Sequence, residues 1–374
     1  MFNLLNLFTD KDFSALAAVQ AQGALLLSSP NPRVGCVLTT SDGAVLGQGH
    51  TQAAGGPHAE VMALRDAAAR GHQVLGATAY VTLEPCAHHG RTGPCCDALI
   101  AAGIKKVVAS IADPNPLVSG QGFERLRAAG VEVVVGPGAA ESRELNIGFF
   151  SRMIRKTPWV RMKIAASLDG KTALLNGKSQ WITGDAARAD GHAWRARSCA
   201  VLTGIGTVLA DNPRLNVRQA GAPRQPHLVV VDSRLETPLD AQLFIAGRAL
   251  FIYAAEQNDA KKAALEALGA VVTYLPGPQH KVDLPAMLQD LALRQVNELH
   301  VEAGHKLNGS LLREGLVDDL LVYTAPKLLG IGCEMAAFGP IESLAEAIDL
   351  HFLAADTVGP DLRLQARIAG RDQF

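Results

Sequence analysis

The sequence lacks a strong excess of charge, a long hydrophobic run and a dense set of cysteines. Its 374 residues carry 35 lysines and arginines against 36 aspartates and glutamates, a formal net charge of −1. This balance argues against a basic nucleic-acid-binding protein and against an acidic tail. No hydrophobic run reaches the roughly 18 residues of a membrane-spanning helix, and six cysteines are too few for a disulfide framework at this length. We therefore expect no nucleic-acid partner and no membrane partner.

The N-terminal stretch, MFNLLNLFTDKDFSAL, differs from a secretory signal. It contains hydrophobic residues, but it also carries Asp10 and Asp12 and has neither a cationic lead nor a small-residue cleavage site. We do not interpret it as a signal peptide, and the expected location is the cytoplasm.

Strand-like and helix-like segments alternate along almost the whole chain. The first half predicts strands at 34–39, 44–48, 77–83, 106–111 and 131–135, with helices at 58–70, 95–102 and 121–129. Asp42-Gly43 predicts a hairpin between the first two strands. Such alternation is typical of α/β domains with a largely parallel sheet.

A second set of segments follows a seam near residue 150, where a Gly-Pro-Gly turn, a short helix through Asn146 and a cationic stretch end at Pro158. Beyond it, strands are predicted at 159–165 and near 200–203, 227–232, 249–253, 271–275, 298–302 and 319–324. The last forty residues are expected to add a terminal strand or two. With 48% hydrophobic residues, the chain can form two cores. We predict an α/β protein with domains at 1–150 and 151–374.

Three candidate metal ligands lie at the ends of predicted helices and strands in the first half. His58 opens one helix, Cys86 follows a strand, and Cys95 follows Pro94 and opens another helix. One imidazole and two thiolates suit Zn²⁺, and a three-ligand site leaves the fourth position for water, as in catalytic zinc sites. Glu60, two residues after His58, is placed to take a proton from the attacking water and pass it to a leaving amine.

This arrangement follows the H-x-E … P-C-x-x-C pattern of zinc nucleobase deaminases, with one departure. Eight residues separate Cys86 from Cys95, where the pattern has two. Cys96 is an alternative to Cys95 as the third ligand, although Cys95 directly follows Pro94. His88 and His89, within the insertion, could bind metal, line the pocket or face solvent.

The segments HAEVMALRDA, TAYVTLEPCAHHGRTGPCCDALIAAG and PNPRVGCV resemble the bifunctional riboflavin-biosynthesis enzymes. In that family an N-terminal pyrimidine deaminase is fused to a C-terminal reductase, and the long P-C-x8-C spacing separates it from ordinary cytidine deaminases. The resemblance implies a cytidine-deaminase-like α/β/α domain followed by a dihydrofolate-reductase-like α/β domain.

The resemblance also implies roles around the metal. Asn31 would contact the pyrimidine, with a turn residue between two prolines as the alternative. His88, His89, Gly90 and Arg91 would shape the pocket. The family has a histidine seven residues before the metal-binding histidine, where this chain has Thr51 and carries His50 one place earlier. The role of His50 is therefore left open.

The second half has no G-x-G-x-x-G after its first strand, so the Rossmann fingerprint is absent. Instead, the segment VEAGHKLNGSLLREG predicts a strand ending at Glu302, a glycine-punctuated loop from Gly304 to Gly309, and then a helix. Backbone N–H groups at such a helix start can bind phosphate, although a glycine-rich loop is often only a turn.

The segments KIAASLDGK, SQWIT, TGIGTVLADNPRL, VDS and the loop after Glu302 are similar, in order, to the reductase half of the family. The resemblance implies that NADPH contacts Ala165, Trp181, Thr207, Asp211, Ser233, Gly304, His305, Lys306, Leu307, Asn308, Gly309 and Ser310. It implies that the substrate contacts Ser179, Arg195, Leu215, Arg218 and Glu302. Arginine is a natural bidentate partner of a ribose phosphate.

The sequence thus predicts an enzyme that uses Zn²⁺ and NADPH on a small-molecule pyrimidine ribosyl phosphate. Deamination of the diaminopyrimidine would precede reduction of the ribosyl group to a ribityl chain. The resemblance also suggests a homo-oligomer. Two alternatives are a deaminase acting on nucleic acid with a non-reducing second domain, and a structural zinc protein with a nucleotide-sensing domain.

Overall fold

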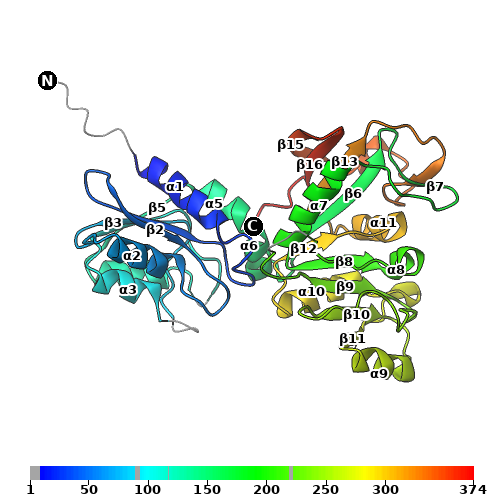
Figure 1. The fold of residues 1–374 in the computed structure, drawn as a ribbon, viewed down its shortest axis with the longest axis horizontal. Helices are drawn as coiled ribbons and strands as arrows, with labels where there is room; N and C mark the ends of the chain where they lie inside the picture. The colour runs from blue at the N-terminus through cyan, green and yellow to red at the C-terminus, as the bar shows by residue number, and fades with distance from the viewer. Residues whose placement is uncertain (1–8, 89–92, 117, 219–221) are drawn as a thin grey trace. The chain divides into compact units, whose positions relative to one another are not determined.

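The computed structural model describes residues 9–88, 93–116, 118–218 and 222–374 (Figure 1). The chain divides into two compact units, Met1–Arg155 and Lys156–Phe374. The boundary predicted near residue 150 falls inside α6 (Ile147–Ile154), the last helix of the first unit.

The first unit is built on a five-stranded mixed sheet with the order β2-β1-β3-β4-β5. Its strands are β1 (Gly35–Thr39), β2 (Val45–His50), β3 (Thr78–Val81), β4 (Lys106–Ala109) and β5 (Glu132–Val135). β1 pairs antiparallel with β2 and with β3, whereas β3, β4 and β5 pair in parallel. The antiparallel β1–β2 pair confirms the predicted hairpin, so the prediction of a largely parallel sheet is wrong only for the pairing of β1 with β3. The predicted hairpin reverses the chain there, and α2 (Ala59–Ala69) then connects β2 to β3.

The remaining helices of this unit are α1 (Asp10–Gln22), α3 (Cys95–Ala101), α4 (Gln121–Ala128) and α5 (Ala139–Leu145). No helix was predicted at 10–22. Thr9 begins it with a capping box, in which the Thr9 N–H donates to Asp12 Oδ2 at 2.7 Å and Thr9 Oγ1 accepts from the Asp12 N–H at 3.4 Å. An acidic residue that argued against a signal peptide therefore starts a helix.

Glycines on β2 allow α2 to lie directly against the sheet. A Cβ at Gly49 would lie 2.5 Å from Met62 Cβ, and one at Gly47 would lie 2.4 Å from the Ala63 carbonyl oxygen. Side chains at either position would push the helix away. This close approach fixes the first turn of α2, which carries Glu60.

The second unit is built on a nine-stranded sheet with the order β11-β10-β9-β8-β12-β6-β13-β16-β15 (Figure 1). The strands from β11 to β13 pair in parallel, and β16 and β15 are antiparallel at one edge. Their bounds are β6 (Trp159–Ser167), β8 (Ala200–Gly204), β9 (His227–Val231), β10 (Leu250–Ala254), β11 (Ala270–Tyr274), β12 (Glu298–Val301), β13 (Asp319–Ala325), β15 (Leu350–Val358) and β16 (Asp361–Ile368). These strands confirm the predicted series, including the terminal strands. A small ribbon of β7 (Lys171–Leu174) and β14 (Gly332–Glu334) was not predicted.

Helices cover both faces of this sheet, as expected for a buried parallel sheet. Alternate residues of β9 enter different clusters: Val229 packs with the cluster that holds Met287, whereas Leu228 packs with the cluster that holds Leu265. The helices are α7 (Asp185–Arg197), α8 (Ile205–Asp211), α9 (Asp259–Ala267), α10 (Leu284–Leu293) and α11 (His305–Arg313). Short 3-10 turns lie at Pro278–His280 and Leu344–Glu346.

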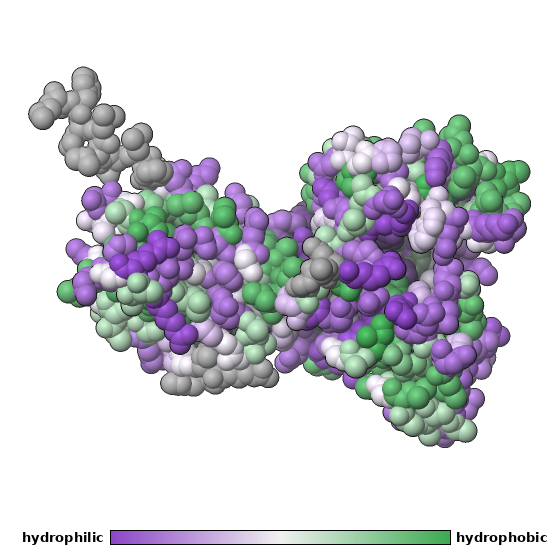
Figure 2. Space-filling view, in the orientation of Figure 1, coloured by the Kyte–Doolittle hydropathy of each residue, from purple (hydrophilic) through white to green (hydrophobic). Residues whose placement is uncertain are grey.

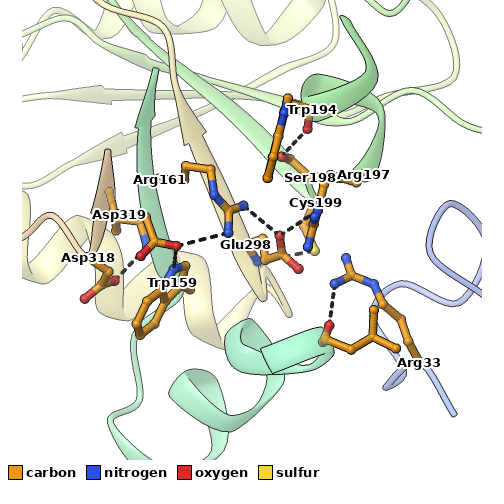
Figure 3. Close-up of polar contacts among 12 residues, drawn as sticks. Arg33, Trp159, Arg161, Trp194, Arg197, Ser198, Cys199, Glu298, Asp318 and Asp319 are labelled. Atoms are coloured by element: carbon orange, nitrogen blue, oxygen red, sulfur yellow. Dashed lines mark hydrogen bonds and ion pairs between the residues drawn. The ribbon is translucent and has the colours of Figure 1, made fainter. Parts of the chain in front are cut away.

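A buried polar network ties β12 to its neighbouring strands. Figure 3 shows the Arg161 guanidinium between Glu298, at 3.1 Å, and Asp319, at 3.2 Å. The Trp159 indole N–H also donates to Asp319 at 2.8 Å. Each buried charge therefore has an opposite partner, which limits its desolvation cost. The network fixes the register of the strand that leads to Glu302.

The surface is mixed in character. In Figure 2, hydrophilic residues are spread over the visible face of each unit, between smaller hydrophobic patches. Among the described residues, every helix is too short or too polar to span a bilayer.

Candidate active sites

The three predicted metal ligands converge in the first unit. His58 Nδ1 lies 3.6 Å from Cys86 Sγ and 3.3 Å from Cys95 Sγ, and all three donor atoms lie within 4.8 Å of one another. With metal–donor bonds of about 2.0–2.3 Å, tetrahedral zinc holds neighbouring donors about 3.3–3.8 Å apart. The donor set and its spacing therefore fit Zn²⁺.

Local structure holds these ligands in place. His58 directly precedes α2, and Cys95 is the first residue of α3. The backbone N–H of Cys95 donates to Cys86 Sγ at 3.3 Å. The Cys95 side chain and the His58 ring hydrogen-bond to Cys86 and, against its burial, lower the pKa of its thiol to about 4. A thiolate is the form of cysteine that binds metal.

Glu60 lies buried in the first turn of α2, beside the ligands. Burial, followed by the charge of Cys86, raises the pKa of Glu60 to about 7. A carboxyl group with a pKa near neutrality can both accept and return a proton, as a general acid–base requires.

Cys96 lies outside the ligand group. Its Sγ is fully buried and donates to the carbonyl oxygens of Pro85 at 3.2 Å and Gly122 at 3.5 Å. Of the two adjacent cysteines, the structure groups Cys95 with His58 and Cys86.

We predict that Cys95→Ser loses zinc, whereas Cys96→Ser retains it. Serine is a poor ligand for Zn²⁺ compared with a thiolate, and Cys96 does not face the other ligands. Metal content of the purified full chain, measured by plasma emission spectrometry, checks this. Zinc kept by Cys95→Ser and lost by Cys96→Ser would reverse the assignment of the third ligand.

The other residues predicted around the metal are more dispersed. Asn31 is half-buried in a turn, where its backbone N–H donates to the Ser28 carbonyl oxygen. The His50 ring packs against Gly23, where an added Cβ would lie 2.7 Å from His50 Nδ1. His88 is exposed. His89, Gly90 and Arg91 lie outside the described residues.

The second unit has a cleft of about 1240 Å³ at the carboxyl ends of its central strands. Ala165, Gly204, Val231 and Glu302 line it where β6, β8, β9 and β12 end. Ligands of open α/β sheets bind at this edge, and the volume exceeds that of a typical small-molecule pocket. All the residues of the second half that were predicted to contact NADPH or substrate line this cleft except Ser233 and Gly309.

An ion pair lies on the cleft wall. Arg195 Nε and Nη2 donate to the two carboxylate oxygens of Glu302 at 2.7 and 2.9 Å, and Nη1 donates to the Asn216 carbonyl oxygen at 2.6 Å. Burial alone would raise the pKa of Glu302, but Arg195 and Lys163 hold it well below its usual range. Glu302 is therefore ionised and fixes Arg195 beside the 215–218 segment.

The same wall contains polar residues to which the sequence analysis gave no role. Lys163, quoted there only as the start of a motif, lines the cleft, and its burial lowers its pKa. His192, one turn before Arg195, accepts from Arg218 Nε at 3.2 Å. The sequence alone did not indicate a role for Lys163. Its position near Glu302 becomes known only when β6 is paired with β12.

The prediction of a loop from Gly304 to Gly309 is wrong. α11 begins at His305, directly after Gly304, so these residues form its first turns. Leu307 and Leu311 lie one turn apart and pack into the core, which favours helix over loop. A Cβ at Gly309 would lie 1.9 Å from the Ala337 carbonyl oxygen, so this glycine permits a close backbone contact with a residue that itself lines the cleft.

Comparison with known proteins identifies both halves. The model of the RibD C-terminal domain matches residues 158–364, more than half of the chain. The model of the cytidine and deoxycytidylate deaminase zinc-binding region matches residues 8–111. The riboflavin biosynthesis protein RibD of Escherichia coli is 46% identical over 371 residues, covering 95% of this chain and 98% of that protein. The chain belongs to the RibD family.

Other RibD proteins are similar to this chain over nearly its whole length. RibD of Aquifex aeolicus is 40% identical, covering 94% of this chain and 97% of that protein. The structure of Acinetobacter baumannii RibD superposes with a TM-score of 0.87 at 40% identity, covering 96% of this chain and 99% of that one. The Thermotoga maritima diaminohydroxyphosphoribosylaminopyrimidine deaminase/5-amino-6-(5-phosphoribosylamino)uracil reductase gives 0.83 at 30% identity, covering 96% and 99%. The predicted family and fold class are thus confirmed.

Proposed function

We propose that the chain catalyses two consecutive steps of riboflavin biosynthesis. The first is hydrolytic deamination of 2,5-diamino-6-(5-phosphoribosylamino)pyrimidin-4(3H)-one. The second is NADPH-dependent reduction of the ribosyl chain of 5-amino-6-(5-phosphoribosylamino)uracil to ribityl. The observation that carries this proposal is the presence, in one RibD-family chain, of the His58–Cys86–Cys95 cluster with Glu60 and of the cleft containing the Arg195–Glu302 pair.

For the deamination, His58, Cys86 and Cys95 would hold Zn²⁺. When bound, this ion would lower the pKa of the attacking water and act as a Lewis acid toward the groups on the reacting carbon. Glu60 would accept a proton from the attacking water and deliver it to the departing ammonia, since its raised pKa allows both transfers. Asn31 would contact the pyrimidine.

For the reduction, the nicotinamide supplies the hydride and the protein supplies orientation. Glu302 would hold Arg195 in place, while Arg195 and Arg218 bind the substrate's phosphate, and Ser179 and Leu215 complete the substrate site. The cofactor would lie along Ala165, Trp181, Thr207, Asp211, Ser233 and the start of α11, from Gly304 to Ser310. The first turn of α11 offers backbone N–H groups to a phosphate.

The test is a mass spectrum of the product formed from the diaminopyrimidine ribosyl phosphate, NADPH and the full chain with zinc. We expect replacement of one nitrogen by oxygen together with a gain of two hydrogens. Replacement without added hydrogen would retain the deaminase and refute the reductase. An unchanged substrate would refute the proposed substrate.

We also propose a homo-oligomer in the cytoplasm. None of the six cysteines, all of which lie among the described residues, is in a disulfide, as expected in a reducing compartment. β15 is an edge strand of the nine-stranded sheet, and nearly all its residues are exposed, with Phe352 at 71%. A long, apolar edge strand is a template for pairing with another chain, and here a second copy would cover it.

We predict that Phe352→Lys converts the oligomer to a monomer, because a lysine ammonium would be placed in the apolar contact. Leu293→Lys, on the equally open surface at the end of α10, should leave the molecular mass unchanged. Light scattering coupled to size-exclusion chromatography measures both. A monomeric wild-type chain, or an unchanged Phe352→Lys oligomer, would contradict the role of β15.

A further inference from the structure

The cleft in the second unit has two chemically different ends. In the strand order β9-β8-β12-β6, Glu302 follows β12, whereas Val231 ends β9 (Figure 1). Two strand spacings of about 4.8 Å put the end of β9 about 10 Å from the end of β12. The Arg195–Glu302 pair marks the substrate end, so a dinucleotide whose nicotinamide lies there extends its adenosine toward β9.

Two cations flank the β9 end. Arg234 immediately follows Ser233 after β9, and Lys281 immediately precedes Val282, whose backbone N–H donates to Ser233 Oγ at 3.3 Å. Both side chains line the cleft and are exposed to it. Ser233, which does not itself line the cleft, thus joins the two cleft-lining cations through the chain: Arg234 is its neighbour in sequence, and its hydrogen-bond partner Val282 is the neighbour of Lys281.

Neither cation is committed to a buried partner. Arg234 Nε lies 3.3 Å from Glu236 Oε2 in an exposed pair, a type of contact that contributes little. Within residues 9–88, 93–116, 118–218 and 222–374, the Lys281 ammonium makes no ion pair or hydrogen bond. These groups are available to an anion.

The other cations of the cleft are placed differently. Lys163, Arg195 and Arg218 lie at the substrate end, and Arg214 Nε donates to Gln242 at 3.0 Å. Arg313 donates to the Ala337 carbonyl oxygen at 2.6 Å and to Ser310 Oγ at 3.0 Å. Lys306, exposed in the first turn of α11, is the one rival for a phosphate outside the substrate end.

We propose that Arg234 and Lys281 bind the 2′-phosphate of NADPH and so set the preference for NADPH over NADH. The inference rests on the proposed reductase function. A 2′-phosphate is the single group that distinguishes the two dinucleotides, and two cations that gain a dianionic partner favour only the phosphorylated form.

The test measures binding of two fragments to the full chain by titration calorimetry. Adenosine 2′,5′-bisphosphate carries the 2′-phosphate, and adenosine 5′-monophosphate lacks it. We expect Arg234→Gln and Lys281→Gln each to raise the Kd of the bisphosphate about tenfold, equivalent to about 1.4 kcal/mol. The Kd of the monophosphate should stay the same within about twofold. An unchanged Kd for the monophosphate also shows that the second unit of each variant is folded.

Lys306→Gln is the matched control and should leave the preference for the bisphosphate intact. A double variant Arg234→Gln/Lys281→Gln that still prefers the bisphosphate, or loss of that preference in Lys306→Gln, would overturn the subsite. A wild-type chain that binds neither nucleotide would instead refute the reductase function, and the subsite with it.

Discussion

Replacing Glu60 with glutamine should reduce ammonia release by about 10²–10⁴-fold, the usual contribution of a general acid–base. Glutamine keeps the size of the side chain but can neither take the proton of the attacking water nor deliver it to the leaving amine. The three proposed ligands are unaltered, so zinc content should not change. Ammonia release, measured with a coupled assay on chain of verified zinc content, gives the result.

The same variant provides its own control, because reduction of 5-amino-6-(5-phosphoribosylamino)uracil takes place in the second unit and should continue at the wild-type rate. The alternative of a structural zinc site makes the opposite prediction, since such a site needs no proton transfer. Full ammonia release by zinc-loaded Glu60→Gln would support that alternative and remove Glu60 from the mechanism.

The metal cluster could be predicted from the sequence because its signals are local. His58 and Glu60 lie two residues apart, and Cys86 and Cys95 each follow a proline at the end of a recognisable segment. Their convergence also needs the starts of α2 and α3 to lie beside the segment that follows β3. The antiparallel pairing of β1 with β3 could not be predicted, because strand order depends on contacts between distant segments.

The cleft of the second unit needed more than the local pattern. The glycine-punctuated segment after Glu302 indicated a loop, and the family resemblance did not change that prediction, whereas tertiary packing of Leu307 and Leu311 makes the segment a helix. Gly309 also has a structural role that the sequence did not indicate, because its missing side chain admits the Ala337 backbone. Lys163 and His192 gain significance only when β6 and α7 are placed beside β12.

Glu302→Gln should lower kcat/KM of the reductase by about 10²-fold or more while ammonia release is unchanged. Removing one partner of a buried ion pair leaves the other charge unpaired, at a cost of about 3–5 kcal/mol, and here Arg195 and Lys163 both lose their counter-charge. Arg195 then no longer fixes the segment that ends at Arg218 through its hydrogen bond to Asn216. The rate of NADPH oxidation measures the effect, and Glu256→Gln, an exposed carboxylate elsewhere in this unit, is the control.

The low pKa of Glu302 predicts how the wild-type reductase depends on pH. Because the pKa of Glu302 lies well below its usual range, its ionised form stabilises the folded state above the unfolded pKa, about 4.3. That contribution is lost only as the pH falls further, through the folded value. Between pH 5 and 8, about the range in which histidine titrates, protonation of Glu302 should therefore cause no loss of wild-type reductase activity.

Arg195→Lys, which keeps the charge but loses the bidentate contact, should raise KM for the ribosyl phosphate more than it lowers kcat. If Glu302→Gln reduced its substrate at the wild-type rate, the ion pair would be structural and the substrate would be oriented by other residues of the cleft.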